Sequence, residues 1–213
     1  MTQPAALAPV TNPTTPRRGP GRPRHAETEP RAYRAALELF GRRGWAGLTL
    51  DGVATHAGIG KSSIYLRWRG KEDLLLDAVR DLQSRLPVPD TTGMGVRDYL
   101  LTHALARAEL FRSDFGQALA NLYAAAASDP EDFAELCSVD VARGMRTHAW
   151  RVEQAVADGE LGPQTRVEPL LEAIEGAIFV HAVCSRAGRS DHEGGVEDFV
   201  ATVVDVQLRG SQG

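Results

Sequence analysis

Cysteines are scarce in this sequence, and their number excludes a disulfide-stapled fold. The chain of 213 residues contains two, Cys137 and Cys184. One pair cannot form a disulfide framework in a chain of this size, and both residues stand in apolar surroundings. We therefore expect two small buried side chains in a reducing compartment.

Long apolar runs are also missing. No stretch reaches the roughly 18 uncharged apolar residues that a membrane span needs. Residues 1–16 have no basic start and only a broken apolar patch, which is unlike a signal peptide. We expect a cytoplasmic protein with no membrane partner.

Strand patterns are absent as well, since no segment alternates apolar and polar residues for long. Hydrophobic residues make up 43% of the chain but aromatics only 6%, and alanine, the best helix former, fills much of the difference. Apolar residues instead recur every three or four positions, which predicts an all-α fold. The expected helices cover residues 30–43, 50–57, 61–68, 71–86, 95–112, 114–127, 130–158, 168–185 and 195–208.

Charge is distributed unevenly along the chain. Residues 17–86 hold 14 basic and 8 acidic residues, a net of +6, whereas residues 87–213 hold 10 basic and 20 acidic residues, a net of −10. A basic first third suits contact with a polyanion, although the whole chain has a net charge of −4. We expect a tail over residues 1–29, a first domain over 30–86 and a second over 87–213.

The stretch GIGKSS, residues 58–63, resembles the end of a phosphate-binding loop. Gly60, Lys61 and Ser62 match the last three positions of that motif. Its first glycine would fall at position 55, which is threonine, and no strand precedes it. Helical residues precede it instead, and their N–H groups are already bonded. The pattern therefore disfavours a nucleotide-binding loop.

Residues 49–68 fit a helix-turn-helix. Thr49 is a suitable N-cap, a glycine-rich turn follows the first short helix, and Ile64 and Trp68 share an inward face of the second. An ordinary polar helix face would have the same spacing. The side chains expected to face outward are Lys61, Ser62, Ser63, Tyr65 and Arg67. Their hydroxyl and cationic groups suit contacts with phosphates and base edges, and Arg67 could pair with guanine.

Two further basic features extend this surface. Lys71 begins the next helix, where a cation opposes the helix dipole and favours a phosphate partner. The segment RRGPGRPR at residues 17–24 is similar to an AT-hook and is kept extended by proline and glycine. Its arginines suit a minor groove, and they are Arg17, Arg18, Arg22 and Arg24.

The run AALELFGRRGWAGLTLDGVATHAGIGKSSIYLRWRGKEDLLLDAV resembles the DNA-binding domain of TetR-type (tetracycline-repressor-type) regulators, over about residues 28–80. The resemblance implies an all-helical homodimer that pairs through its last two helices, with a ligand pocket in the C-terminal bundle. It places the outward residues of 61–67 on a recognition helix, and Thr49 and Lys71 at phosphate-contacting positions. Three places depart from the family pattern: Gly60 for a Ser or Thr cap, Leu66-Arg67 for His or Tyr, and Trp68 for Phe.

Candidate pocket residues in the second domain are less specific, because aromatic residues at helical spacing are more often core. They are Phe111, Phe115, Tyr123, Met145, His148 and Trp150. The six histidines show no metal-ligand pairing, and no Ser/His/Asp or Cys/His set is suggested by local sequence. We expect no metal, no cofactor and no enzymatic activity.

The expected function is a ligand-responsive repressor that binds a near-palindromic operator in double-stranded DNA and is released by a small molecule. One alternative is an effector-independent, architectural DNA-binding dimer, in which the C-terminal bundle only dimerises. A helical nucleotide-binding protein that uses Gly60-Lys61-Ser62 is a third possibility, from a different functional class.

Overall fold

The chain folds into helices throughout the part that the structure describes. The computed structural model describes residues 27–137, 143–186 and 195–210, and no strand occurs within them, so the expected all-α class is confirmed. None of the described helices is long and apolar enough to cross a membrane. In chain order the helices are α1 (Thr28–Gly47), α2 (Leu50–Ala57), α3 (Lys61–Tyr65), α4 (Lys71–Arg85), α5 (Val96–Arg112), α6 (Gly116–Ser128), α7 (Pro130–Cys137), α8 (Arg143–Ala157), α9 (Val167–Arg186) and α10 (Gly195–Gly210).

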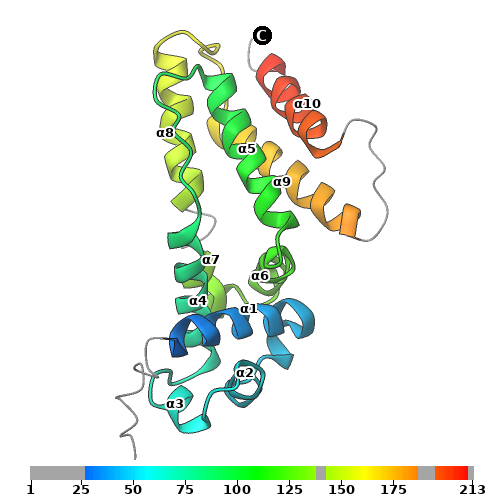
Figure 1. The fold of residues 1–213 in the computed structure, drawn as a ribbon. Helices are drawn as coiled ribbons and strands as arrows, with labels where there is room; N and C mark the ends of the chain where they lie inside the picture. Colours follow the sequence, from blue (N-terminus) through cyan, green and yellow to red (C-terminus); the bar gives the residue numbers. More distant parts are fainter. Residues whose placement is uncertain (1–26, 138–142, 187–194, 211–213) are drawn as a thin grey trace, which may run out of the picture.

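Two groups of helices make up the molecule. Figure 1 shows α1 to α4 at one end and α5, α8, α9 and α10 at the other, with α6 and α7 between them. Each group encloses its own cluster of buried apolar side chains. In the first cluster Ala36 and Phe40 of α1 meet Val53 of α2, Ile64 of α3 and Leu75 of α4.

Helix α6 joins the two groups. Leu122 is buried in the first cluster and Leu119 in the second, so α6 contributes to both cores. The Asn121 amide donates to the carbonyls of Phe40 at 2.8 Å and Gly41 at 2.9 Å, near the end of α1. The DNA-contacting candidates are therefore attached to the second domain by packing as well as by the chain.

Helix α1 is longer than expected but is bent where the sequence predicts its end. Gly44 has φ 65°, in the left-handed region that glycine enters without a steric penalty. Residues 45–47 continue beyond this kink. The bend turns Trp45 back against Phe133 of α7, with ring centroids 4.9 Å apart.

Helix α3 is shorter than expected, and the predicted end at Trp68 is wrong. The helix ends at Tyr65, because the amide of Arg67 bonds to the Ile64 carbonyl three residues back, at 3.0 Å, and tightens the last turn. Trp68 still reaches the core and is only 3% exposed.

The single long helix expected over residues 130–158 is described as two separate helices. Helix α7 packs on α6 and α4, whereas α8 packs on α9 and α5. Figure 1 shows the two in different parts of the molecule. The residues between them, 138–142, lie outside the described part of the chain. Val152 and Ala155 of the predicted seam are fully buried in the second cluster.

Candidate functional site

The segment from α2 to α3 has the geometry of a helix-turn-helix. The Thr49 hydroxyl accepts a hydrogen bond from the Gly52 amide at 3.0 Å, which caps α2. Helix α2 ends at Ala57, and the φ of 62° at Gly58, the next residue, makes the sharp turn possible. Gly60 then precedes α3 without a side-chain cap. A helix on each side of the turn is the wrong setting for a phosphate-binding loop, as the sequence had indicated.

The outward face of α3 presents polar side chains to solvent. Ile64 is fully buried and anchors the helix to the first core. Lys61 and Ser62 are exposed, Tyr65 is 56% exposed, and Ser63 is half-buried. These predicted contacts do lie on one exposed segment.

Sequence reasoning missed Asp51, which holds two of the predicted contacts together. Its carboxylate on α2 pairs with the Lys61 Nζ at 2.6 Å and accepts from the Tyr65 hydroxyl at 3.2 Å. The hydrogen bond from Lys61 is the main cause that lowers the pKa of Asp51. No local sequence pattern marks this contact, because Asp51 lies at the start of α2 and meets Lys61 only once α3 is packed beside α2. The cation that would meet a phosphate is thus paired with a carboxylate in the free chain.

Arg67 is turned back toward the protein. Its guanidinium donates to the Ser63 carbonyl at 3.0 Å and lies 3.5 Å from a carboxylate oxygen of Glu29 in α1. Only 20% of the side chain is exposed. The neighbouring Leu66 is 85% exposed, and sequence reasoning did not single it out as a contact. The predicted pairing of Arg67 with guanine would require the side chain to leave both partners.

Lys71 begins α4 and has partners of its own. Its Nζ donates to the Trp45 carbonyl at 2.8 Å and stands 4.0 Å from the centre of the Trp45 ring. This cation–π contact closes the kink of α1 against the start of α4. The arm arginines Arg17, Arg18, Arg22 and Arg24 lie outside the described residues.

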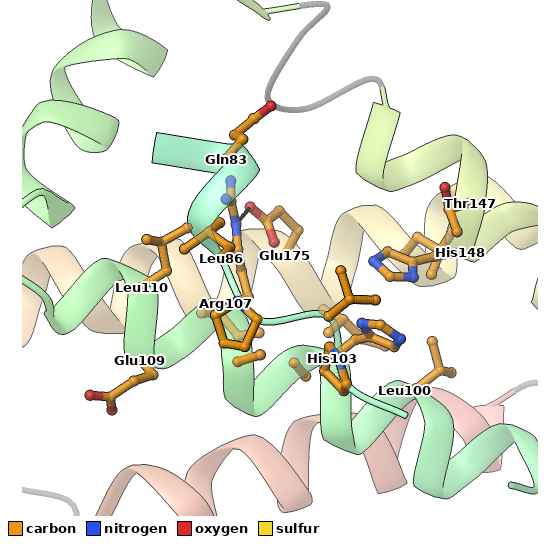
Figure 2. Close-up of a pocket in the computed structure, with 18 of the residues that line it drawn as sticks. Gln83, Leu86, Leu100, His103, Arg107, Glu109, Leu110, Thr147, His148 and Glu175 are labelled. Carbon is orange, nitrogen blue, oxygen red and sulfur yellow. Dashed lines mark hydrogen bonds and ion pairs between the residues drawn. The ribbon is translucent and has the colours of Figure 1, made fainter. Parts of the chain in front are cut away.

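A cavity of about 1080 Å³ opens in the second domain, beneath the end of α4. Helices α5, α8 and α9 form most of its wall, and the last turn of α4 with residues 86–89 closes one side (Figure 2). Apolar side chains dominate, and they include Leu86, Leu100, Leu110, Leu171, Ile174 and Ile178. The size and lining suit a small amphipathic ligand.

The pocket residues expected from the sequence are mostly placed elsewhere. His148 lines the cavity, Phe111 is buried in the second core, and Phe115 packs against the first. Tyr123 donates its hydroxyl to Glu175 at 2.9 Å, and Trp150 is 62% exposed. Met145 belongs to α8, and its side chain is outside the described part.

Two histidines face each other at one end of the cavity, and sequence reasoning did not pair them. The ring centroids of His103 and His148 are 4.6 Å apart, and the Tyr99 hydroxyl lies 3.0 Å from His148 Nδ1. Burial, with the nearby charges of His103 and Arg107, lowers the pKa of His148 to about 4. Burial also lowers the pKa of His103. Both rings are therefore neutral at neutral pH.

The lowered pKa of His148 predicts a loss of stability in mild acid. Between pH 6.5 and 4 the unfolded chain binds a proton at this residue that the folded chain does not, so stability falls as the pH falls. We expect the wild type to lose about 1 kcal/mol more than His148→Gln between pH 7.5 and 5.5. Urea unfolding at both pH values measures this difference.

The matched control for that measurement is Gln154→Ala. Gln154 is an exposed residue of the same helix that carries no titratable group, so this variant should keep the wild-type loss. Equal pH dependence in the His148→Gln variant and the wild type would contradict the assignment.

Exposed valines mark a surface on α9 and α10, the last two helices. Val180 is 57% exposed, Val183 42% and Val206 47%. The helices pack on each other, and His181 of α9 stacks on Phe199 of α10 with ring centroids 4.1 Å apart. We call these three valines the α9–α10 surface. Among the described residues, no group of three or more His, Cys, Asp or Glu could hold a metal ion.

Comparisons with known proteins agree with this arrangement. The family model described as bacterial regulatory proteins of the tetR family matches residues 32–78, and the model of the tetracyclin repressor-like C-terminal domain matches residues 88–205. The uncharacterized HTH-type transcriptional regulator YdeS of Bacillus subtilis is 32% identical over 161 residues, which cover 75% of this chain and 80% of that protein.

Solved structures share the fold. MexZ, a repressor responsible for antibiotic resistance in Pseudomonas aeruginosa, has a TM-score of 0.65 at 19% identity, over 85% of this chain and 94% of its own. FadR of Bacillus subtilis, solved with stearoyl-CoA, has a TM-score of 0.69 at 15% identity, over 84% of this chain and 97% of its own. With both family models matched in order and a relative matched over most of its length, the chain belongs to the tetR family of bacterial regulatory proteins.

Proposed function

We propose that this TetR-family transcriptional regulator is a ligand-responsive repressor. Two copies would pair through the α9–α10 surface and place their α3 helices in successive major grooves of a near-palindromic operator, about 34 Å apart. Such a regulator works where the bacterial chromosome is, in the cytoplasm. It has no catalytic role in this scheme.

The observation that carries the DNA-binding role is the exposed face of α3 on a rigid support. Lys61, Ser62 and Tyr65 reach solvent while Ile64 and Trp68 are fixed in the core, so the contacts are presented without a large ordering cost. Thr49 and Lys71 would approach phosphates from either side. The arm arginines would add minor-groove contacts.

Support for a ligand comes from the cavity and its contact with α4. Gln83 and Ser84 of α4 line the cavity, while Leu74 and Leu75 of the same helix pack in the first core with α1. A bound molecule would therefore act on a helix that also positions α3. We expect ligand binding and operator binding to weaken each other, with a coupling free energy of about 1–3 kcal/mol.

Two similar proteins favour this reading over a dimer without effector. FadR was solved with stearoyl-CoA, and MexZ is described as a repressor. At 15% and 19% identity these two structures show a shared fold. That this chain binds a ligand and represses transcription is therefore our proposal.

Titration of a fluorescent operator duplex at several salt concentrations tests the DNA-binding role. We expect the logarithm of the binding constant to fall with the logarithm of the salt concentration, and Lys61→Ala to lower both affinity and slope. Absence of a salt slope would contradict phosphate contacts. An unchanged footprint for Arg67→Ala would remove Arg67 from the base-reading set.

Replacing Asp51 by asparagine should strengthen binding to DNA of any sequence. The change removes a carboxylate next to the backbone and frees Lys61 and Tyr65, so we expect about threefold higher affinity for random duplex and a salt slope steeper by about 0.9. The exposed Asp158, far from α3, gives the matched control Asp158→Asn. Weaker binding to random duplex by Asp51→Asn would contradict this role for Asp51.

A further inference from the structure

The histidine end of the cavity has hydrogen-bonding capacity that the protein does not use. His148 Nδ1 is engaged by the Tyr99 hydroxyl at 3.0 Å. Among the described residues, nothing within hydrogen-bond distance meets His148 Nε2 or either ring nitrogen of His103. Both residues line the cavity, and Figure 2 shows their rings next to each other at one end of it. A polar group of a ligand at this end would meet two imidazoles.

The lining of the cavity carries three arginines and two glutamates. On α5, Arg107 lies one turn beyond His103. On α9, the carboxylate of Glu175 is 2.8 Å from the Arg107 guanidinium and also accepts from the Tyr123 hydroxyl. On α8, Arg146 lines the cavity, and the Arg151 guanidinium is paired with Glu160 at 2.8 Å.

At the other edge of the cavity, one basic group is paired with a carboxylate and one acidic group is remote from the histidines. Arg80 at the α4 edge is paired with Glu135 at 2.7 Å. Glu109, the second acid in the lining, is exposed and points away from the histidine end in Figure 2. No carboxylate of the described residues pairs with His103 or His148.

We propose that the cavity binds an amphipathic anion, with its apolar body along Leu100, Leu171, Ile174 and Ile178 and its negatively charged head on the ring nitrogens of His103 and His148 that have no partner within the described residues. This inference rests on the proposed function, in which the cavity is the effector site. A cationic head would meet Arg107 and Arg146, while the carboxylate of Glu109 points away from this end of the cavity. A neutral head would use the hydrogen bonds but gain nothing from the positive field.

Binding of an anion here should take up protons. Burial and neighbouring positive charge keep the pKa of His148 low in the empty cavity, and burial does the same for His103. A carboxylate bonded to the ring nitrogens offsets the neighbouring positive charge and so favours the charged imidazole. Affinity should then increase as the pH falls from 8 to 6.

Isothermal titration calorimetry of the intact protein, without DNA, tests the ligand class. The probes are decanoate, decanol and decylamine, which share a chain and differ in head charge. We expect decanoate to bind at least about tenfold more tightly than either of the others at pH 7. Repeating the decanoate titration in buffers of different ionisation enthalpy should show net proton uptake.

Two conservative variants locate the head. His103→Gln and His148→Gln keep a hydrogen-bonding side chain, and each should weaken decanoate binding and reduce proton uptake while leaving decanol unchanged. His56→Gln, on the surface of α2, should behave as the wild type. If one of these variants folds poorly, proton uptake by the wild type still tests whether the bound head is an anion.

Equal binding of decanol and decanoate, tighter binding of decylamine, no binding of decanoate, or no proton uptake would each overturn the anion proposal. A different result would contradict the proposed regulatory function without contradicting the ligand class. If decanoate binds as expected but does not release the operator duplex, then the ligand class stands and the regulatory role of the cavity falls.

Discussion

Replacing Trp68 by alanine should lower the free energy of unfolding by about 3–5 kcal/mol, the usual cost of truncating a large buried aromatic side chain. Trp68 follows α3 and is 3% exposed. Its ring packs edge-on against Tyr33 of α1, with centroids 5.9 Å apart, and its Nε1 donates to the Asp77 carboxylate of α4 at 3.0 Å. One side chain thus joins three helices of the first core, and we expect its loss to unfold the DNA-binding end.

Urea unfolding followed by far-ultraviolet circular dichroism measures this effect, and the chain supplies its own control. Trp150 on α8 is 62% exposed, so Trp150→Ala should change stability by less than about 0.5 kcal/mol. Trp68→Phe keeps the aromatic packing but loses the bond to Asp77, and it should fall between the two. A Trp68→Ala variant as stable as Trp150→Ala would mean that Trp68 does not hold α3 in place.

Placing a charge on the α9–α10 surface should separate the dimer and abolish operator binding. Val180 is 57% exposed in the single chain, so aspartate there costs the folded monomer little. In a two-fold interface the same carboxylate would be buried twice, unpaired, which is strongly unfavourable. We expect Val180→Asp to be monomeric by sedimentation and to bind operator at least about a hundredfold more weakly, because two half-sites no longer act together.

Ala124→Asp provides the comparison for that variant, because Ala124 is exposed and lies on α6, outside the α9–α10 surface. It should remain dimeric and bind as the wild type. A dimeric Val180→Asp protein would place the interface elsewhere on the molecule. A monomeric Val180→Asp protein that still binds a palindromic duplex with full affinity would show that dimerisation is not required.

The local features of the first domain could be predicted from the sequence because they depend on neighbours in the chain. Thr49 as a helix cap, Gly58 at the turn and Ile64 as the buried anchor of α3 follow from helix periodicity and from the conformations that glycine allows. The end of α3 was misplaced because Trp68 is buried without being helical. Burial alone does not reveal the tightened turn at Arg67.

The long-range features could not be predicted, because each depends on how helices cross. Asp51 is an ordinary first-turn acid until α3 is placed beside it. His103 and His148 are 45 positions apart in the sequence and meet only because α5 and α8 pack together. The same holds for α6, whose Leu119 and Leu122 serve two different cores. No periodicity in one segment contains that information.

Selection of bound sequences from a library of random duplex DNA tests the central claim most directly, because it yields half-site, spacing and symmetry together. We expect the full-length protein to recover a near-palindrome whose two halves are about one or more whole helical turns apart. The Lys61→Ala variant should bind all recovered sequences more weakly than the wild type does. Recovery of no common sequence, or of a single site without symmetry, would contradict a dimeric, sequence-specific regulator that reads DNA through α3.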